Sequence, residues 1–416
     1  MNIWLICQYY KPEPGAPSAR LSGFAKIWKQ EMQRVTVLTA VPNHPDGIIK
    51  EGYKNKSMEE EIDGIRVKRH PLYVTHNSGF IKKIISHISF AATVLFMNLS
   101  TKGKSKPDVI IASSPSFFAA ISAWLLSVRY RVPFVMEVRD LWPGIFVELG
   151  VMREGIILNI LEWVELFLYR RADKVVTVTR GFAENIVRRG IPQEKLVIIT
   201  NGVSDDEIDK ATIPSQDGSV DKLRNELQLH PLAKVVLYIG AHGTSQALGQ
   251  IIDVARMMMS QTEVLFIFVG DGADKARLQK SAKGMPNVQF VDSQSKERVW
   301  QFYNMAYVSV VPLKDTPGFA TFIPSKMFEI MASKRPFIGC VRGEAAQIME
   351  QSGGALVVPP EDPEKLADAI KTLVDSDEKV IEMGESGQKF VSAYFRHSIL
   401  AKRYLDALLK VTGKSA

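Results

Sequence analysis

Short apolar runs rich in β-branched residues recur along the chain, and helix-forming segments separate them. In the first half these runs are NIWLICQYY, RVTVLTA, GIRVKRHP, DVIIASS, PFVMEVRD, KVVTVT and LVIIT; in the second half they are KVVLYIG, VLFIFVG, NVQFVDS, VSVVPL, RPFIGC and ALVVPP. Continuous apolar runs that alternate with helices are typical of strands in a parallel sheet covered on both faces. The sequence therefore predicts an α/β fold with two Rossmann-like, doubly wound parallel-sheet domains.

The length of the chain agrees with two domains, because 416 residues exceed what one hydrophobic core usually supports. The series of apolar runs is interrupted at residues 205–224, which are largely polar and have no apolar run of their own. We therefore expect a first domain over residues 1–204, a linker over 205–232 and a second domain over 233–389. Residues 390–416 have a helical pattern, and a terminal helix of this kind can pack back onto the first domain.

Composition excludes several classes of protein. Apolar residues make up 46% of the chain and charged residues 23%, which is typical of a globular protein. The two cysteines, Cys7 and Cys340, lie in strand-like runs and are expected to be buried and reduced. No cysteine and histidine cluster has metal-ligand spacing, and the first residues lack the basic region of a signal peptide. We expect a cytoplasmic protein.

The first half is basic, with 27 Lys and Arg against 18 Asp and Glu in residues 1–200. Within it, segment 82–106 consists of an apolar stretch between two groups of lysines. The apolar part, residues 84–99, is too short to span a bilayer. It can be a core helix, or a helix that lies on an anionic membrane surface, where each lysine contributes about 1 kcal/mol. A nucleic acid partner is not expected, because no reader motif is present.

The sequence TFIPSKMFEIMASKRP, residues 321–336, places a lysine and a glutamate in an apolar helical segment. Pro324 ends any preceding helix, and Ser325 or Thr321 can cap the helix that follows. A helix N-terminus attracts phosphate, and Lys326 adds a full positive charge. Glu329 follows Ser325 by four residues, so its carboxylate can accept hydrogen bonds from a ribose. The alternative is a simple Lys326–Glu329 pair along the helix surface.

Two further turns of the second half follow strands and contain glycine, which lets a ligand approach the backbone. YIGAHG has Gly240 and Gly243, and FVGDG has Gly270, Asp271 and Gly272. Each turn is a weak signal when taken alone, because glycine often ends strands for steric reasons. Together with Ser325, Lys326 and Glu329, these residues form the predicted donor site.

The first half has two comparable turns. Gly15 follows the first strand, and Arg20 lies in the helix after it, where a cation opposes the helix dipole and so suggests a ligand. At the end of a central strand stand Glu137, Arg139 and Asp140, which are costly there unless they are paired or face a cleft. We expect Gly15, Arg20 and Glu137 to bind an acceptor and Arg139 and Asp140 to join Lys326 in catalysis. A Glu137–Arg139 ion pair is the alternative.

The order of these motifs resembles the nucleotide-sugar glycosyltransferases of the GT-B fold, in particular the group-1 (family 4) set. The resemblance extends over nearly the whole chain and includes GAPSARLSGFAKIW, RDLWP, VLYIGAHG, FVGDGADKARL and PSKMFEIMASKRP. RDLWP and PSKxFE look like a bacterial branch from capsule and O-antigen biosynthesis that includes N-acetyl-L-fucosaminyltransferases. The resemblance implies that the second domain binds the nucleotide and the first domain the acceptor.

Residue by residue, Glu329 matches the second glutamate of the family's E-x7-E element, which binds the ribose. Gly240 and Gly243 match the glycine loop beside the diphosphate, and residues 270–272 match a VGDG turn. Three positions depart from the family pattern. Thr321 replaces the first glutamate, residues 244–247 lack the usual Arg and Lys, and Arg139 stands where many members have histidine.

These features predict a glycosyltransferase that moves an N-acetylated deoxyhexose from a UDP-sugar to a polyprenyl-diphosphate-linked saccharide, at the inner face of the cell membrane. No DxD-type metal site is recognised, so no metal or other cofactor is expected. Two alternatives remain open at this stage. One is a UDP-sugar epimerase of the same architecture, and the other is an inactive homologue that tethers a partner at the membrane.

Overall fold

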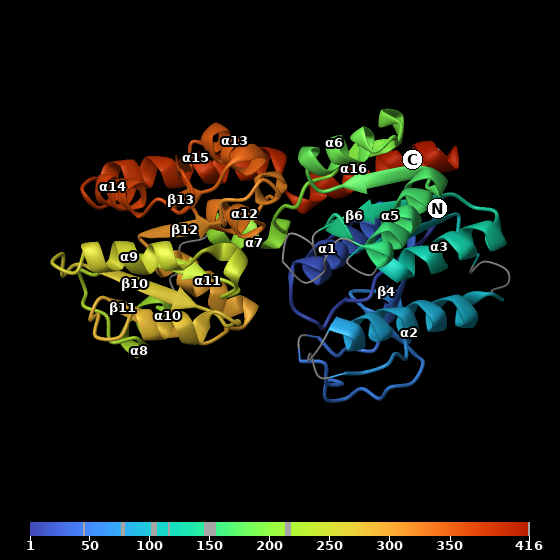
Figure 1. Ribbon diagram of the computed structural model, residues 1–416, viewed down its shortest axis with the longest axis horizontal. Helices are drawn as coiled ribbons and strands as arrows, with labels where there is room; N and C mark the ends of the chain where they lie inside the picture. The colour runs from blue at the N-terminus through green and yellow to red at the C-terminus, as the bar shows by residue number, and fades with distance from the viewer. Residues whose placement is uncertain are drawn as a thin grey trace. The chain divides into compact units, whose positions relative to one another are not determined.

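The computed structural model describes residues 1–414 except 45, 76–79, 101–105, 115–116, 145–154 and 213–217. It divides into two compact units, which are described separately here (Figure 1). The first unit contains residues 1–201 and 397–416, and the second contains residues 202–396. Each is a helix-covered sheet.

The first unit has a sheet of eight strands in the order β3-β4-β2-β1-β5-β6-β7-β8. All neighbouring strands are parallel except β3 and β4, which are antiparallel. The strands are β1 (Asn2–Ile6), β2 (Arg34–Ala40), β3 (Met58–Ile62), β4 (Ile65–His70), β5 (Val109–Ser113), β6 (Phe134–Val138), β7 (Lys174–Thr177) and β8 (Leu196–Ile198). The helices are α1 (Ala16–Gln30), α2 (Phe80–Asn98), α3 (Phe117–Tyr130), α5 (Ile156–Arg171), α6 (Arg180–Arg188) and α16 (His397–Thr412).

Alternate residues of the central strand β1 enter two cores, one on each face of this sheet. Trp4 and Ile6 pack with α2, α3 and α5, whereas Ile3 and Leu5 pack with α1 and α16. Helix α16 lies against α1, and the indole N–H of Trp28 donates to the carbonyl of Ala401 at 2.8 Å. The last helix of the chain therefore completes the core of the first unit.

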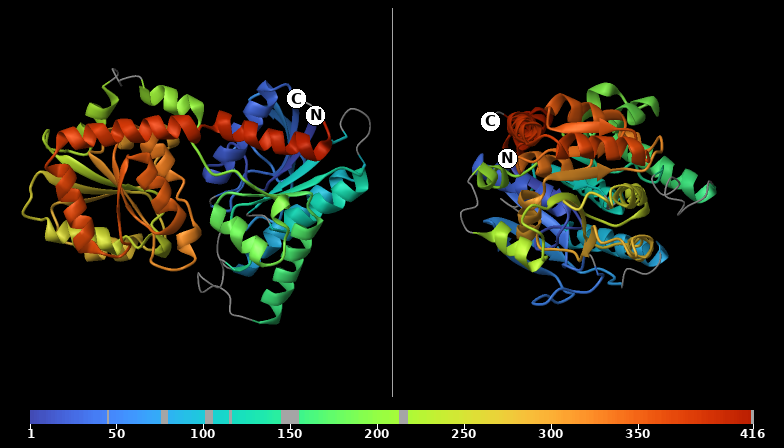
Figure 2. Two further views of the ribbon diagram at one scale, coloured as in Figure 1. Left: turned by 90° about the horizontal axis from the view of Figure 1, so that it is seen from above. Right: turned by 90° about the vertical axis from the view of Figure 1, so that its left-hand side faces the viewer.

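The second unit has six parallel strands in the order β11-β10-β9-β12-β13-β14, with helices on both sides of the sheet (Figure 2). The strands are β9 (Lys234–Ile239), β10 (Val264–Val269), β11 (Val288–Val291), β12 (Val308–Pro312), β13 (Phe337–Cys340) and β14 (Ala355–Val358). The helices are α7 (Asp205–Thr212), α8 (Ser219–Glu226), α9 (Gly249–Met257), α10 (Lys275–Ser281), α11 (Lys296–Met305), α12 (Lys326–Ala332), α13 (Gly343–Ser352), α14 (Pro363–Val374) and α15 (Asp377–Tyr394).

The fold class predicted from the sequence is confirmed, since both units are helix-covered sheets of Rossmann type. The interpretation of residues 205–232 as a linker is wrong. Residues 205–212 form α7 and residues 219–226 form α8, and the buried side chains of Ile208 and Leu223 enter a core of the second unit. Val220 packs against the same core, and such scattered apolar side chains produce no continuous apolar run.

Arg20 and Glu137 form a buried ion pair inside the first unit. The guanidinium Nε of Arg20 lies 3.1 Å from Glu137 Oε1, and the two side chains are 3% and 0% exposed. The other Arg20 nitrogens donate to the carbonyl oxygens of Ile199, at 2.8 Å, and Thr200. Ser113 donates its hydroxyl to the second carboxylate oxygen of Glu137 at 2.5 Å.

The structure therefore gives Arg20 and Glu137 a role different from the predicted acceptor binding. Each nitrogen of the Arg20 guanidinium has a protein acceptor, and the side chain is 3% exposed. The predicted alternative, a Glu137–Arg139 ion pair, is also wrong, since the partner of Glu137 comes from α1. The pair joins α1 to β6 and to the chain that follows β8.

We expect the Arg20→Met substitution to destabilise the first unit by about 3–5 kcal/mol, because it leaves the Glu137 carboxylate buried without its counter-charge. The control is Lys11→Ala, which removes an exposed ion pair with Asp63 and should cost at most about 1 kcal/mol. Urea unfolding followed by tryptophan fluorescence reports mainly on the first unit, which holds five of the six tryptophans. Equal midpoints for both variants would contradict this prediction.

Candidate functional site

The strand order of the second unit defines the position of its candidate site. Strands β9 and β12 are neighbours, but the chain runs outward from β9 to β11 on one side and from β12 to β14 on the other. In open α/β sheets, ligands bind at the carboxyl ends of the strands where the order reverses in this way. The turn after β9 and helix α12, which follows β12, both lie at that edge.

Gly240 and Gly270 end two adjacent strands at the same level. Ile239 pairs with Val269 in register, and the Gly240 N–H donates to the Val269 carbonyl at 2.9 Å. Both glycines have φ of 140°, which disfavours other residues. A Cβ on Gly270 would lie 2.0 Å from the Gly240 carbonyl oxygen, and a Cβ on Gly240 would lie 2.6 Å from Lys326 Nζ. Gly240 therefore leaves room for the Lys326 ammonium, and Gly270 leaves room for the Gly240 carbonyl.

Lys326 is the first residue of α12, and its Nζ lies 4.1 Å from the ring centroid of Tyr238. No carboxylate among the described residues lies within ion-pair distance of it, so the predicted alternative of a Lys326–Glu329 pair is wrong. Burial lowers the pKa of Lys326 to about 7, and the opposing attraction of Glu329 is smaller. The ammonium therefore rests on an aromatic face and has capacity for an anionic ligand.

Glu329 lies one turn further along α12 and accepts a hydrogen bond from the Tyr303 hydroxyl at 3.2 Å. Burial raises the pKa of Glu329 to about 7, and the negative charge of Glu207 adds to the shift. Lys296, which forms an ion pair with Glu207 at 2.5 Å, acts in the opposite direction. Strongly perturbed titratable groups that lie together at a ligand-binding edge are typical of functional sites.

The predicted capping of α12 is wrong. Ser325 occupies the N-cap position, but its backbone is helical and its side chain makes no capping hydrogen bond. Thr321 ends a short 3-10 helix, and its hydroxyl donates to the Gly318 carbonyl at 2.8 Å. The N–H groups of Met327 and Phe328 donate to carbonyls of the preceding turn. Lys326 is therefore the main cationic group that this helix offers.

His242 is a residue that the sequence reasoning missed. Its ring is 0% exposed, and neither ring nitrogen has a hydrogen-bond partner among the described residues. Burial lowers its pKa, so the imidazole is neutral at pH 7. Its backbone bonds to the Asp271 carbonyl and to the Asp274 N–H, which attaches the turn after β9 to the turn after β10. A histidine between the two glycines of the turn after β9 was the available signal.

The remaining predicted donor residues lie in the turns after β9 and β10. Asp271 is exposed, and its carboxylate accepts from the N–H of Gly272 at 2.7 Å. A Cβ on Gly272 would lie 2.4 Å from the His242 carbonyl oxygen, so only glycine fits against that turn. Gly243 has φ of −107°, which any residue adopts, and it precedes a 3-10 turn at Thr244–Gln246.

The other predicted residues lie in the first unit. Gly15 is the exposed N-cap of α1 with φ of 110°. Arg139 and Asp140 follow β6, and the Arg139 N–H donates to the Ser114 hydroxyl at 2.7 Å. Arg139 Nε and Nη1 are buried without a hydrogen-bond partner in the described part of the chain. Burial lowers the pKa of Arg139 and raises the pKa of Asp140. These two residues remain a prediction for catalysis.

The chain has two Rossmann-type sheets, and a lysine and a glutamate lie at the strand-order reversal of the second sheet. Together these features define a protein of the GT-B class. Comparison with protein-family models agrees with this class. Residues 15–202 match a glycosyl transferase 4-like domain, and residues 233–376 match glycosyl transferases group 1. The chain belongs to this family of glycosyltransferases, as the resemblance of its motifs predicted.

Among proteins of similar sequence, WcaI of Escherichia coli is 28% identical over 379 residues, which cover 89% of this chain and 91% of WcaI. WcaI is named as a glycosyl transferase of colanic acid biosynthesis. WbjE of Pseudomonas aeruginosa, named as a glycosyltransferase, is 22% identical over 69% of this chain and 71% of its own length.

Solved structures share the fold. HepE of Anabaena, solved in complex with UDP and glucose, superposes with a TM-score of 0.72 and 18% identity over 99% of this chain and 100% of its own. Sucrose-phosphate synthase of Thermosynechococcus elongatus superposes with a TM-score of 0.75 and 19% identity over 100% of both chains.

The pH dependence of UDP binding tests the assignments of Lys326 and Glu329. Diphosphate binding needs the Lys326 ammonium, which is lost as pH rises above about 7, and ribose binding needs the Glu329 carboxylate, which is lost as pH falls below about 7. We therefore expect affinity to be highest near pH 7, measured by titration calorimetry between pH 5.5 and 8.5. Lys326→Met should remove the decline in UDP affinity at high pH. Glu329→Gln should remove the decline in affinity at low pH, except for the part that comes from protonation of UDP itself.

Each of these variants should also weaken binding about tenfold or more at pH 7, because each removes a hydrogen bond to a charged group. The matched control is Lys280→Met, which changes an exposed lysine of α10 in the same unit. Wild-type affinity and pH dependence in both Lys326→Met and Glu329→Gln would exclude these residues from the donor site.

Proposed function

We propose that this glycosyltransferase moves a sugar from a UDP-sugar to a saccharide carried on a polyprenyl diphosphate. The observation that carries the proposal is the Lys326 ammonium, which lies over Tyr238 at the strand-order reversal with no carboxylate partner among the described residues. It supplies a positive charge where a nucleotide diphosphate binds in sheets of this type. Glu329 follows on the same helix and supplies a hydrogen-bond acceptor for the ribose.

Departure of UDP is the step that these residues assist. Negative charge develops on the diphosphate as the bond to the sugar breaks, and a cation already in place stabilises it without reorganisation. Lys326 provides that cation, and the low polarity of its surroundings strengthens the attraction. Asp140 and Arg139 are proposed to act on the acceptor side. This chemistry requires no metal ion or other cofactor.

The donor sugar is proposed to be an N-acetylated deoxyhexose such as N-acetyl-L-fucosamine. Support comes from the RDLWP and PSKxFE motifs, which resemble transferases of that specificity from capsule and O-antigen biosynthesis. WcaI, with its colanic acid name, agrees with a role in building a bacterial surface polysaccharide. HepE, which was solved with UDP and glucose, agrees with a UDP-linked donor.

We expect UDP-N-acetyl-L-fucosamine to raise the melting temperature of the protein more than GDP- or dTDP-sugars do, since a ligand at 100 times its Kd stabilises by about 2.7 kcal/mol. With a polyprenyl-diphosphate-linked N-acetylhexosamine as acceptor, UDP release should proceed in EDTA at an undiminished rate. Lys326→Met should lower the rate at least about tenfold, whereas Lys280→Met should not. A requirement for added Mn²⁺ would refute metal independence, and release without any acceptor-linked product would refute transfer.

The proposal also places this protein in the cytoplasm, at the inner face of the cell membrane. No helix within the described ranges is both long and apolar enough to cross a bilayer. Helix α2, which overlaps segment 82–106, nevertheless exposes large apolar side chains, including Ile88 at 46% and Phe96 at 70%. Lys82 and Lys83 are exposed at its beginning. An exposed apolar face with adjacent lysines suits an anionic membrane surface.

The apolar surface continues beyond α2. Helix α2 packs against α3, which also contacts α5. Val128 of α3 is 60% exposed, and Ile157 and Trp163 of α5 are 69% and 63% exposed. Tryptophan is favoured at membrane interfaces because its ring is apolar and its N–H is polar. These helices extend the proposed membrane-binding surface.

Vesicle sedimentation tests this surface. We expect the protein to bind vesicles rich in phosphatidylglycerol and to bind phosphatidylcholine vesicles much more weakly. Lys82→Glu should weaken binding to the anionic vesicles at least about fivefold, because each lysine near such a surface contributes about 1 kcal/mol. Phe96→Ser should weaken it through lost apolar burial. Leu232→Ser is the control, since Leu232 is 75% exposed but belongs to the second unit. Equal binding by all variants would refute the membrane contact.

A further inference from the structure

Glu329, which the proposed function assigns to the ribose, is influenced by groups from two helices other than its own. Its helix α12 contacts α7, and Tyr303 of α11 donates its hydroxyl to Glu329 Oε2 at 3.2 Å. Tyr303 is 1% exposed, and the α12 residues on both sides of Glu329 are buried as well. A carboxylate in such surroundings keeps its charge only where neighbouring groups stabilise it. These neighbours therefore decide how well Glu329 can accept a hydrogen bond from a ligand.

Helix α11 brings two polar side chains to one face. Lys296 is the first residue of this helix and Tyr303 follows seven positions later, which is about two helical turns, so the two side chains lie on the same side. Tyr303 bonds to Glu329, whereas Lys296 forms an ion pair with Glu207 of α7, with Nζ at 2.5 Å from Oε1. One helix face therefore connects α7 with α12.

Glu207 is held in position on α7 by a second set of contacts. Its other carboxylate oxygen accepts from the Ser204 N–H at 3.2 Å, and the Ser204 hydroxyl accepts from the Glu207 N–H at 3.3 Å. This reciprocal arrangement is a capping box, in which glutamate and glutamine can both serve. Burial opposes ionisation of Glu207, but the attraction of Lys296 lowers its pKa, so this carboxylate is charged at pH 7.

Four titratable groups act on the Glu329 carboxylate. Burial raises the pKa of Glu329 to about 7, and the negative charge of Glu207 adds to that shift. Lys296, the Tyr303 hydroxyl and Lys326 act in the opposite direction. Glu207 and Lys296 thus form a pair whose members have opposite effects on the same carboxylate, although neither forms an ion pair with it in the described part of the chain.

Other elements in contact with α12 place their ion pairs elsewhere. Strand β12 has no titratable side chain. In α7 and α15, further acids pair with cations that lie outside α12: Asp205 and Asp209 with Arg396, and Glu385 with Lys334. The balance at Glu329 is therefore set mainly by the four groups named above.

We infer that Glu207 and Lys296 are positioning residues of the donor site, which control the charge of Glu329 through space while Tyr303 fixes the direction of its carboxylate. Because Lys296 pairs with Glu207, the lysine stabilises Glu329 without occupying it. The Oε1 atom of Glu329 has no hydrogen-bond partner among the described residues and stays open to a ribose hydroxyl. The inference rests on the proposed function, since it describes how the ribose acceptor of that function is kept charged.

The protonation midpoint of Glu329 tests this inference without any nucleotide. The whole chain is labelled with carbon-13 at the glutamate carboxyl groups, and NMR follows the Glu329 resonance, which is identified by its absence in Glu329→Gln. We expect Glu207→Gln to lower the midpoint by about 0.5–1 pH unit, because a nearby negative charge is removed. Lys296→Met should raise the midpoint by a similar amount, because a nearby positive charge is removed. Lys296→Arg, which keeps the charge, should retain the wild-type midpoint.

UDP binding by the same variants connects the midpoint to the donor site. Calorimetry at pH 6.5 should give about twofold tighter binding for Glu207→Gln and about twofold weaker binding for Lys296→Met, since the charged form of Glu329 binds the ribose. Protonation of UDP itself affects all variants alike. The double variant Glu207→Gln/Lys296→Met removes the pair as a unit and should return both the midpoint and the affinity toward their wild-type values.

Arg298→Met is the matched control. Arg298 lies on α11 two residues after Lys296 and forms a comparable ion pair with Glu226 of α8, at 2.6 Å. Its loss should leave the Glu329 midpoint and the UDP affinity unchanged. Glu207→Gln should remain folded, because glutamine can replace glutamate in the capping box, and circular dichroism identifies the variants that keep the fold.

Three results would overturn the inference. They are an unchanged Glu329 midpoint in both Glu207→Gln and Lys296→Met, shifts of the same sign in both, and UDP affinities that equal the wild-type value although the midpoint moves. Shifts of the same sign would indicate a general disturbance of the structure. Failure of the wild-type protein to bind UDP would count against the proposed function, whereas the midpoint would still show whether these residues control the charge of Glu329.

Discussion

The Lys326 ammonium occupies a place where a charged group is costly, and much of the second unit is arranged around that constraint. Burial favours its neutral form, as the lowered pKa indicates, and the nearest compensation is the face of Tyr238. Gly240 and Gly270 both have φ of 140°, which disfavours other residues, and a Cβ on Gly270 would also collide with the Gly240 carbonyl oxygen. The free-energy cost of removing a charge from water is offset only when a partner of opposite charge is present, and a diphosphate is such a partner.

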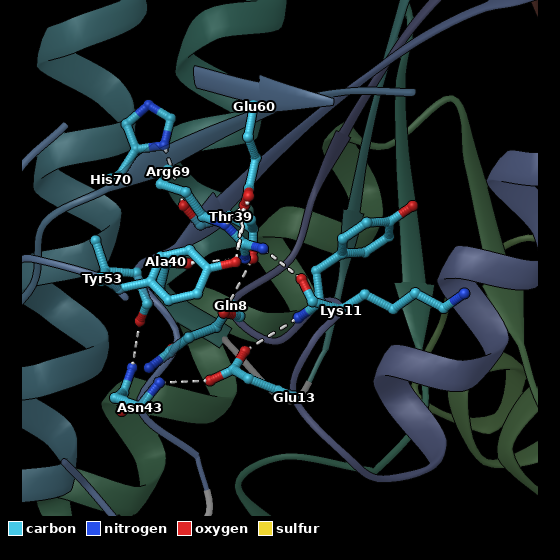
Figure 3. Close-up of polar contacts among 12 residues, drawn as sticks. Gln8, Lys11, Glu13, Thr39, Ala40, Asn43, Tyr53, Glu60, Arg69 and His70 are labelled. Atoms are coloured by element: carbon cyan, nitrogen blue, oxygen red, sulfur yellow. Dashed lines mark hydrogen bonds and ion pairs between the residues drawn. The ribbon is translucent and has the colours of Figure 1, made fainter. Parts of the chain in front are cut away.

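The two units use the same edge of a similar sheet in opposite ways. In the first unit, the buried charges of Glu13 and Arg69 (Figure 3) and of Arg20 are satisfied by protein groups, which stabilise loops. In the second unit, Lys326 has no charged partner among the described residues, and Glu329 has only a tyrosine hydroxyl. Arg139 of the first unit also has buried guanidinium nitrogens without a hydrogen-bond partner among the described residues, so the difference lies in the other charged groups.

Sequence reasoning identified thirteen of the fourteen strands that the described residues form, since buried parallel strands are continuous apolar runs. It missed β3, whose sequence MEEEI contains three acids. That strand is stable because it lies at the edge, antiparallel to β4, where Glu59 pairs with Arg66 and Glu60 with Arg69. Such stabilisation depends on a partner strand and has no local pattern. The buried pair of Arg20 and Glu137 was misread for the same reason, because its members are 117 residues apart.

Sequence reasoning could predict those parts of the candidate site that follow from residue type. It could not predict the parts that depend on local backbone geometry. The lysine and glutamate of α12 were identified from their types and spacing, but the capping by Ser325 was not found, because a serine at an N-cap can still have helical backbone angles. The departures from the family pattern have a common consequence. Because Thr321 is bonded within its own turn and residues 244–247 contain no cation, the proposed neutralisation of a nucleotide diphosphate depends largely on Lys326. Since burial lowers the pKa of Lys326 to about 7, the proposed nucleotide binding is expected to depend on pH.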